Sequence, residues 1–417
     1  MEKSGKFRLT SLERNWILYD VGNSAFVLMV ATLIPIFFNA LAAAGGLSSV
    51  EYLAYWGYAS SAVTIITAVL SPILGTVADT KGFKKPIFIL CVFVGIVGCC
   101  AMGAVSAWLP FLVIFVIAKV GFSGSLVFYD SMLSDVTTPD RMDEVSSRGY
   151  AWGYIGSCVP FVVCLGLVLG AGSIGISQMT ALNLALLLTA AWWLLTTLPL
   201  LKSYKQLYYV EVEKHAVRQS FARIGHTLRH LPEDKQVFWF LLAFFCYIDG
   251  VYTIIDMATA YGTALGLDTT GLLLALLVTQ IVAFPSALIF GRLSNKYPSA
   301  KLIPVCIAAY ACIAVFAFFL TRQWQFWVLA VIVGMFQGGV QALSRSHFAK
   351  IIPPEKSGEY FGLFDICGKG ASFLGTMIVS VGSQLTGSAN VGVGSLIVLF
   401  IVGFVLFRVS CRQGETA

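Results

Sequence analysis

Long apolar blocks alternate with short polar segments along almost the whole chain. Each block is long enough to cross a hydrocarbon layer of about 30 Å as a helix, at about 1.5 Å of rise per residue. Barrel strands are excluded, because a strand needs only about 9–11 residues of alternating polarity. We therefore expect an all-α integral membrane protein with twelve transmembrane helices, at residues 16–44, 52–77, 86–106, 108–133, 149–169, 177–198, 236–261, 271–293, 301–321, 324–348, 360–385 and 391–408.

The composition agrees with this pattern. Of the 417 residues, 58% are hydrophobic and only 12% are charged, about half the charged share of an average soluble domain. These values exclude a disordered chain, a fibrous repeat and a nucleic-acid binder, and they argue strongly against a soluble enzyme. The first apolar block is too long for a cleavable signal peptide, so we expect it to be the first retained helix.

The 27 Lys and Arg residues predict the orientation. With the N-terminus placed in the cytoplasm, nearly all of them fall on the cytoplasmic side, and only Arg322 lies in an external loop. This distribution follows the positive-inside rule. It predicts that both chain termini lie in the cytoplasm. The compact termini and short central loop favour a bacterial plasma membrane.

An internal repeat divides the chain. The polar segment 202–235 is expected to be a cytoplasmic linker between two six-helix bundles, at residues 1–201 and 236–417. Gly75-Thr-Val-Ala-Asp79-Thr-Lys-Gly82 ends the second block, and Gly291-Arg-Leu-Ser-Asn295 ends the eighth in the same way. Parallel repeats of six helices are typical of transporters whose two bundles rock about a central site.

Two segments resemble a known family. The segment Gly75-x-x-x-Asp79-x-x-Gly82-x-Lys84-Lys85 resembles the cytoplasmic loop motif of the major facilitator superfamily. Trp16-Ile-Leu-Tyr-Asp20-Val-Gly-Asn23-Ser-Ala-Phe26 is similar to the opening of its vacuole-effluxer branch, which includes autophagy-associated amino-acid exporters and bacterial relatives. The resemblance implies the major facilitator fold, efflux and an amino-acid-like cargo.

Charged and polar residues inside the blocks are candidates for the solute site, because a charge in the bilayer costs a few kcal/mol or more. Lys119 and Asp249 lie near mid-depth, and their opposite charges suit a zwitterion. The resemblance implies that the first, fourth, seventh and tenth helices line a central cavity. The expected solute-binding residues are Asp20, Asn23, Lys119, Tyr247, Asp249, Tyr252, Gln337 and Gln341.

Proton coupling is a second use for the acidic residues, since desolvation favours the neutral carboxyl. The candidates are Asp20, Asp249, Asp365 and Lys369. Alternatives remain open for each group. Asp365 and Lys369 are four residues apart, so they can instead neutralise each other on one helix face.

Other charged residues can also have a structural role instead of binding the solute or a proton. Lys119 can form a structural ion pair, and Asp20 can brace its helix with Asn23. Asp256, nearer the external end of the seventh block, is expected to be hydrated.

A gate is expected at the cytoplasmic ends of the helices. The resemblance implies that Asp79 faces the start of the eleventh helix and nearby basic groups, and so holds an outward-open state. Asn295 replaces this Asp in the second copy, which predicts an asymmetric lock. The expected gating residues are Gly75, Asp79, Gly82, Lys84, Lys85, Asp130, Arg148 and Arg345. Asp130 or Asp135 is expected to pair with Arg148 or Arg345.

These features predict a monomeric secondary active transporter that moves a small polar or zwitterionic solute across the lipid bilayer by alternating access, coupled to H⁺. The sequence has no nucleotide-binding motif, catalytic constellation or metal-ligand spacing, so we expect no enzyme activity, cofactor or metal. The alternatives are a lipid or amphiphile exporter (a flippase) on the same fold, and a non-transporting membrane sensor or scaffold.

Overall fold

The computed structural model describes residues 7–211, 225–227 and 229–415. Most of these residues lie in helices. The first half contains α1 (Ser11–Ala31), α2 (Leu33–Ala44), α3 (Ser49–Ala78), α4 (Lys84–Met102), α5 (Trp108–Ser131), α6 (Leu133–Val136), α7 (Met142–Leu169) and α8 (Gln178–Ser203). The second half contains η1 (Leu231–Glu233), α10 (Lys235–Ala264), α11 (Thr269–Leu293), α12 (Ser299–Phe318), α13 (Gln323–Ile351), η2 (Pro354–Lys356), α14 (Ser357–Thr386), α15 (Ala389–Gly394) and α16 (Ile397–Glu415).

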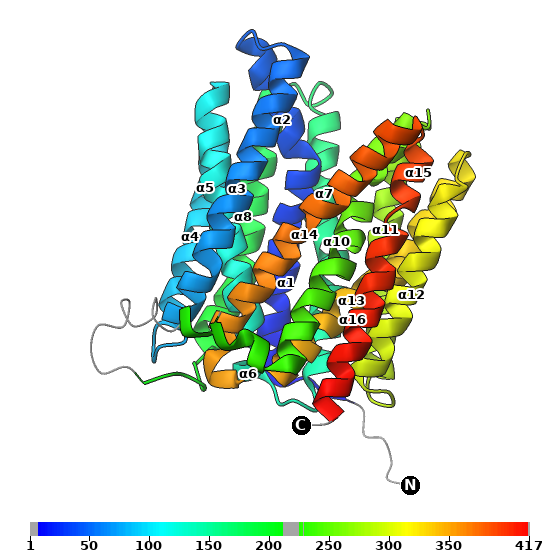
Figure 1. Ribbon diagram of the computed structural model, residues 1–417. Coiled ribbons are helices and arrows are strands. Elements are labelled where there is room, and N and C mark those ends of the chain that lie inside the picture. Colours follow the sequence, from blue (N-terminus) through cyan, green and yellow to red (C-terminus); the bar gives the residue numbers. More distant parts are fainter. Residues whose placement is uncertain (1–6, 212–224, 228, 416–417) are drawn as a thin grey trace.

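The helices form two bundles that lie side by side (Figure 1). Helices α1 to α8 make the N-terminal bundle, and α10 to α16 make the C-terminal bundle. Both chain ends lie at the same end of the molecule (Figure 1), which we call the terminal end; the opposite end is the distal end. This agrees with an even number of membrane crossings. The expected domain limits, with a linker at 202–235, remain a prediction, and part of that linker lies outside the described residues.

The predicted all-α membrane fold is confirmed. Within the described residues, eleven helical segments are long and apolar enough to span a membrane, and α14 adds a twelfth long helix of 30 residues. The first predicted block is divided into α1 and α2 at Thr32. Pro35 explains the break, because its ring nitrogen cannot donate to the carbonyl of Ala31 and its ring crowds that carbonyl.

Polar side chains fix several helix starts. Thr10 and Glu13 form a capping box at the start of α1, and Ser48 and Glu51 form another at α3. The predicted start of the fifth helix, at residue 149, was wrong: α7 begins at Met142, about two turns earlier. The polar first turn of α7 extends the helix beyond the apolar block, because acidic side chains are favourable at a helix N-terminus.

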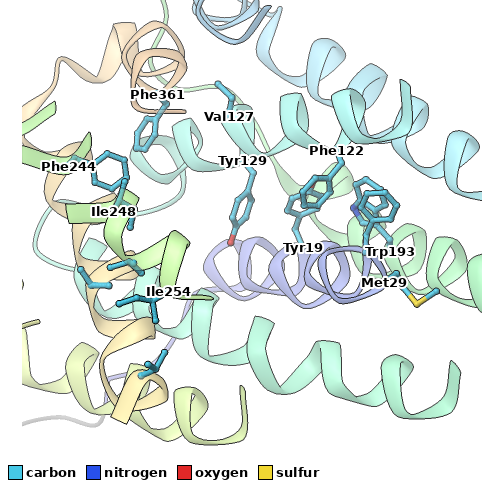
Figure 2. Close-up of a cluster of buried hydrophobic side chains, with 14 of the residues drawn as sticks. Tyr19, Met29, Phe122, Val127, Tyr129, Trp193, Phe244, Ile248, Ile254 and Phe361 are labelled. Carbon is cyan, nitrogen blue, oxygen red and sulfur yellow. The ribbon is translucent and has the colours of Figure 1, made fainter. Parts of the chain in front are cut away.

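Aromatic side chains fill the interior of both bundles (Figure 2). In the N-terminal bundle, Trp193 lies 5.6 Å from Phe26 and 5.7 Å from Phe122, measured between ring centroids. In the C-terminal bundle, the rings of Phe244 and Phe364 are stacked at 3.9 Å. Each bundle therefore has its own packed interior, which suits movement of one bundle against the other.

The polar contacts between the bundles gather towards the terminal end. They join the end of α3 to the start of α14, and the first half of α7 to α11 and to the second half of α13. The terminal end is closed by these contacts in this conformation.

Candidate gate and solute site

One close polar contact between the bundles is made by Asp79 at the end of α3. Its Oδ1 accepts a hydrogen bond from the backbone N–H of Gly358 at 2.7 Å, and its Oδ2 accepts one from Glu359 N–H at 2.8 Å. Both donors belong to the first turn of α14, where unpaired amides favour an anion. Asp79 is fully buried and thus caps a helix of the other bundle. This is the placement that the loop motif implies.

Gly75 allows the two helices to come this close. A Cβ atom at Gly75 would lie 2.1 Å from the carbonyl oxygen of Gly358, and a Cβ at Gly358 would lie 2.6 Å from the carbonyl oxygen of Gly75. Only two glycines fit such an approach of backbone to backbone. The pair is therefore required for the closed conformation.

We call the contact between Asp79 and the start of α14 the latch. Lys84 neutralises its acidic groups. Its side chain is 0% exposed, and its Nζ lies 3.7 Å from Asp79 and 3.5 Å from Asp135. It also donates to Ser357 Oγ of α14 at 2.8 Å. Lys84 was expected among the gating residues, and the structure adds that it is a buried cation between two carboxylates.

The other two loop residues of the motif contact the segment after α8. Gly82 has φ +80°, which glycine adopts without strain, and its N–H donates to Gln206 Oε1 at 3.0 Å. Lys85 Nζ lies 3.4 Å from the carbonyl oxygen of Tyr204. Both contacts stay within the N-terminal half, so these residues support the loop that carries Lys84.

The second copy of the motif makes a weaker contact. Asn295 Nδ2 donates to Glu144 Oε2 of α7 at 3.2 Å. Glu144 also binds Arg148, whose Nη2 lies 2.7 Å from its Oε1. The expected pairing of Arg148 with Asp130 was therefore wrong, because the carboxylate one turn away on the same helix is nearer. One side-chain hydrogen bond replaces the two backbone bonds that Asp79 accepts, so the two copies of the motif make unequal contacts.

Arg345 crosses from α13 into the N-terminal bundle. Its Nη1 lies 2.9 Å from Asp130 Oδ1 and 3.7 Å from Asp20 Oδ2, and its Nε donates to Ser146 Oγ at 2.9 Å. The side chain is 2% exposed. Arg345, the other arginine considered for Asp130, is thus its partner. Asp20 lies beside the same guanidinium.

Three aromatic rings of the N-terminal bundle surround the Arg345 guanidinium. Its carbon lies 4.3 Å from the ring centre of Tyr150, 4.7 Å from Trp16 and 5.4 Å from Tyr129. Such cation–π contacts are worth about 0.5 to 2 kcal/mol each when desolvated. Two carboxylates and three rings therefore hold one cation of the other bundle.

Several side chains that were expected to bind the solute are buried in the protein interior. Tyr247 is fully buried, with its hydroxyl 2.7 Å from Ser344 Oγ. Asn23 donates to the carbonyl oxygen of Tyr19 at 3.0 Å and lies 3.4 Å from Asp20 Oδ1, so it braces α1.

Asp249 is also inaccessible to a solute in this conformation. Its Oδ1 accepts hydrogen bonds from Gly375 N–H at 2.9 Å and from Thr253 Oγ1 at 3.3 Å, all within the C-terminal bundle. Its Oδ2 has no hydrogen-bond partner among the described residues. Asp249 therefore contacts its own bundle and does not line a path between the bundles in this conformation.

The expected glutamines lie at the contact between the bundles. Tyr154 of α7 donates to Gln341 Oε1 at 3.1 Å, whereas Gln337 Oε1 is buried and has no hydrogen-bond partner among the described residues. Asp365 accepts a hydrogen bond from Ser71 of α3 at 2.7 Å. The side chain of Lys369 lies outside the described residues, so its expected pairing with Asp365 is untested.

A cation and an anion on opposite bundles remain accessible. Lys119 on α5 is half-buried, and its Nζ lies 4.7 Å from the ring centre of Phe122. Asp256 on α10 is exposed, in agreement with the expected hydration. Lys119 and Asp256 belong to different bundles. Tyr252, one turn before Asp256, is half-buried and within electrostatic range of its carboxyl.

Sequence reasoning missed the roles of three acidic residues and the partner of a fourth. Glu144 binds a gate cation, Asp256 is the exposed acid of α10, and Glu359 is fully buried beside the latch. Asp135, expected to pair with Arg148 or Arg345, lies 3.5 Å from Lys84 instead. A signal for Asp256 was available, because an ionisable residue inside an apolar block is costly and therefore marks a candidate site.

The fold is that of the major facilitator transporters. The human organic anion transporter MFSD10 (TETRAN) is similar with a TM-score of 0.72 at 14% identity, over 95% of this chain and 99% of that one. The transporter FucP, solved in its outward conformation, is similar with a TM-score of 0.71 at 16% identity, over 96% and 97%. At such low identities these similarities establish the fold.

The family follows from the sequence itself. The model of the family described as "Vacuole effluxer Atg22 like" matches residues 11–416, and the chain belongs to that family. An uncharacterized MFS-type transporter of Bacillus subtilis, YxiO, is 42% identical over 98% of this chain and 97% of its own length. Autophagy-related protein 22 of Coccidioides immitis is 24% identical over 65% of this chain, which spans about half (51%) of that relative. The chain is therefore an integral membrane transporter of the major facilitator type.

Proposed function

We propose that the protein moves a zwitterionic, amino-acid-like solute by alternating access, and that Lys119 and Asp256 bind its two ends. The observation that carries this proposal is the presence of a half-buried cation on α5 and an exposed acid on α10, which belong to different bundles. A solute carboxylate would bind Lys119, and a solute ammonium would bind Asp256.

The aromatic residues near this pair suit the same cargo. Phe122 and Phe26 lie 4.7 Å and 6.0 Å from Lys119 Nζ, measured to their ring centres. Both rings are buried in the N-terminal bundle, and they keep water from one side of the ammonium group. Binding between the bundles would also couple the solute to their movement, because the solute contacts both.

In this proposal the two latches at the terminal end define one of the two transport states. Asp79 on the start of α14 and Arg345 in its aromatic cage hold that end shut. Rocking of the bundles would break both contacts and open the site to the terminal side. We place that side in the cytoplasm, on the distribution of Lys and Arg.

We further propose that H⁺ is the coupling ion, that Asp249 carries it, and that the protein acts as a monomer. Asp249 is 0% exposed and has one unpaired oxygen, so it is suited to hold a proton when the terminal end is closed. Export is the favoured direction, since the family is described as vacuole effluxers. The Bacillus relative supports a bacterial plasma membrane.

Thermal-shift screening of the purified protein tests the cargo class. Amino acids, dipeptides, nucleosides, sugars and amphiphiles would be compared, and amino acids are expected to raise the melting temperature. Lys119→Met and Asp256→Asn should remove that shift. The exposed-residue variants Lys205→Met and Asp140→Asn serve as matched controls and should keep it. Stabilisation by amphiphiles alone would favour the exporter or flippase alternative instead.

A further inference from the structure

The residues that follow α8 lie against the loop that carries the latch. Helix α8 ends at Ser203, and we call residues 204–210 the linker strap, because they begin the segment between the two bundles. Val210 pairs in parallel with Thr80, the residue that follows Asp79. The linker strap therefore passes beside the residues that close the terminal end.

Hydrogen bonds hold the linker strap in this place. Val210 N–H donates to the carbonyl oxygen of Asp79 at 2.8 Å. The side chain of Gln206 bonds the same loop with both ends of its amide. Its Oε1 accepts from Gly82 N–H at 3.0 Å, and its Nε2 donates to the carbonyl oxygen of Ala78 at 3.1 Å. These bonds fix the strap relative to the end of α3.

Asp135 of α6 binds the linker strap in the protein interior. Its Oδ1 accepts the N–H groups of Leu207 at 3.0 Å and Tyr208 at 2.9 Å, and its Oδ2 accepts the hydroxyl of Tyr204 at 2.6 Å. The side chain of Asp135 is 0% exposed, and Tyr204 is 2% exposed. The strap thus supplies a buried carboxylate with hydrogen-bond donors on both of its oxygens.

The same carboxylate competes for the cation of the latch. Lys84 Nζ lies 3.5 Å from Asp135 Oδ2 and 3.7 Å from Asp79 Oδ1. It also donates to Ser357 Oγ of the other bundle at 2.8 Å. A buried carboxylate that lacks other donors attracts a nearby ammonium group strongly, because an unpaired buried charge is costly. The donors of the linker strap reduce this attraction, so Lys84 can remain with Asp79 and Ser357.

We propose that the linker strap is a positioning element of the latch, and that Tyr204 is its central contact. With the strap bound, Asp135 leaves Lys84 between the bundles, and the latch is stable. Without the Tyr204 hydroxyl, Asp135 draws Lys84 away from α14, and the latch weakens. In the open state Asp79 is hydrated and needs Lys84 less. Loss of the strap contact therefore destabilises the closed state more than the open state, which shifts the balance towards opening.

Surface contacts of the linker strap contribute less to this effect. Lys81 Nζ lies 3.4 Å from Glu211 Oε1, but the two side chains are 61% and 75% exposed. Exposed ion pairs add little to stability, because water and salt screen them. The buried contact of Tyr204 with Asp135 is therefore the one to test.

Hydrogen–deuterium exchange of the full chain without solute tests the proposal. The amides of Gly358 and Glu359 are bonded to Asp79 in the closed state, so their exchange reports opening. Tyr204→Phe should raise this exchange roughly threefold to tenfold, the usual effect of one lost hydrogen bond. Amides in the middle of α12 should not change, which separates opening from global unfolding. Tyr297→Phe, the same change at a 51% exposed tyrosine of the terminal end, is the matched control and should exchange as the wild type does.

A second substitution separates positioning from a general loss of stability. Asp135→Asn keeps an acceptor for the strap amides but removes the charge that competes for Lys84. In this background Tyr204→Phe should have no effect, and the double variant should exchange no faster than the wild type. A strap that only stabilises the fold predicts faster exchange in the double variant than in either single variant. Gln206→Ala, which frees the strap from the α3–α4 loop, should behave as Tyr204→Phe does in both backgrounds.

The inference deepens the proposed alternating access and rests on it. Wild-type exchange in both Tyr204→Phe and Gln206→Ala, or additive increases in the double variant, would overturn it. Gly75→Ala, which should lose the closed conformation, is the positive control. Faster exchange in Gly75→Ala alone would refute the role of the linker strap, whereas no increase in any variant would also refute closure by the latch. Solute is absent throughout, so these results are independent of the Lys119–Asp256 site.

Discussion

The Arg345 guanidinium of the C-terminal bundle lies 2.9 Å from the Asp130 carboxylate of the N-terminal bundle. The two residues are on helices that line the centre of the fold, and their contact lies at the terminal end. Asp20, a residue for which sequence reasoning favoured solute or proton binding, lies 3.7 Å from the same guanidinium. The charged residues at the terminal end therefore contact one another across the bundles, and we assign those further along the helices to the solute.

Loss of this contact should open the terminal end. Asp130→Asn removes the charge and keeps the shape, and Arg345→Gln removes the caged cation. Breaking a buried pair at one partner costs about 3 to 5 kcal/mol, so the closed state should lose most of its population. Labelling of introduced cysteines near the terminal end would measure the change. Labelling rates equal to those of the parent protein would show that Arg345 does not hold the gate.

The contact between Gly75 and Gly358 should not tolerate a methyl group. Gly75→Ala places a Cβ 2.1 Å from a backbone oxygen, which cannot move without shifting α14. We expect the closed conformation to be lost and transport to be reduced at least tenfold. Gly57→Ala is the matched control on the same helix, because a Cβ there meets no atom within 4 Å. Equal transport by the two variants would contradict this assignment.

Each copy of the loop motif should need its own residue for closure, Asp79 in the first copy and Asn295 in the second. Asp79→Asn loses a carboxylate that accepts two backbone hydrogen bonds, and it should shift the balance towards the state open at the terminal end without abolishing solute binding. Asn295→Asp brings a second carboxylate towards Glu144, 3.2 Å away, and should also loosen that end. Cysteine accessibility measures both. No change in either variant would refute the asymmetric lock.

The hydrophobic pattern was sufficient to predict the helices and their membrane class. The length of an apolar block indicates whether the segment can cross the bilayer. The break near Pro35 follows from the chemistry of proline alone. The motif at residues 75–85 placed Asp79 opposite the eleventh helix through its resemblance to a family. That placement depends on residues far apart in sequence, and spacing alone could not have found Gly358.

The pattern could not predict which way a buried polar side chain points. Helix α10 is apolar on most of its surface, so its periodicity does not separate the side facing α14 from the side facing the other bundle. Asp249 was chosen for its depth, yet it contacts Gly375, and Asp256 is the accessible acid. Lys84 was treated as a loop cation for a similar reason: its partners Asp135 and Ser357 are distant in sequence.

The proposed solute site depends on two charges of opposite sign. Lys119→Met and Asp256→Asn should each reduce transport at least tenfold while the protein keeps its expression and fold. The loss should exceed that of Asp140→Asn, an exposed control. Exchange of both charges, in Lys119→Asp with Asp256→Lys, should restore part of the activity, because a zwitterion can bind in the reverse sense.

Counterflow of a labelled amino acid in proteoliposomes tests the central claim most directly. The wild type should exchange internal for external amino acid, each single variant should lose exchange, and the double charge exchange should recover it in part. Full exchange by both Lys119→Met and Asp256→Asn would contradict the account, because the solute would then cross the protein without the two charges that are proposed to bind it.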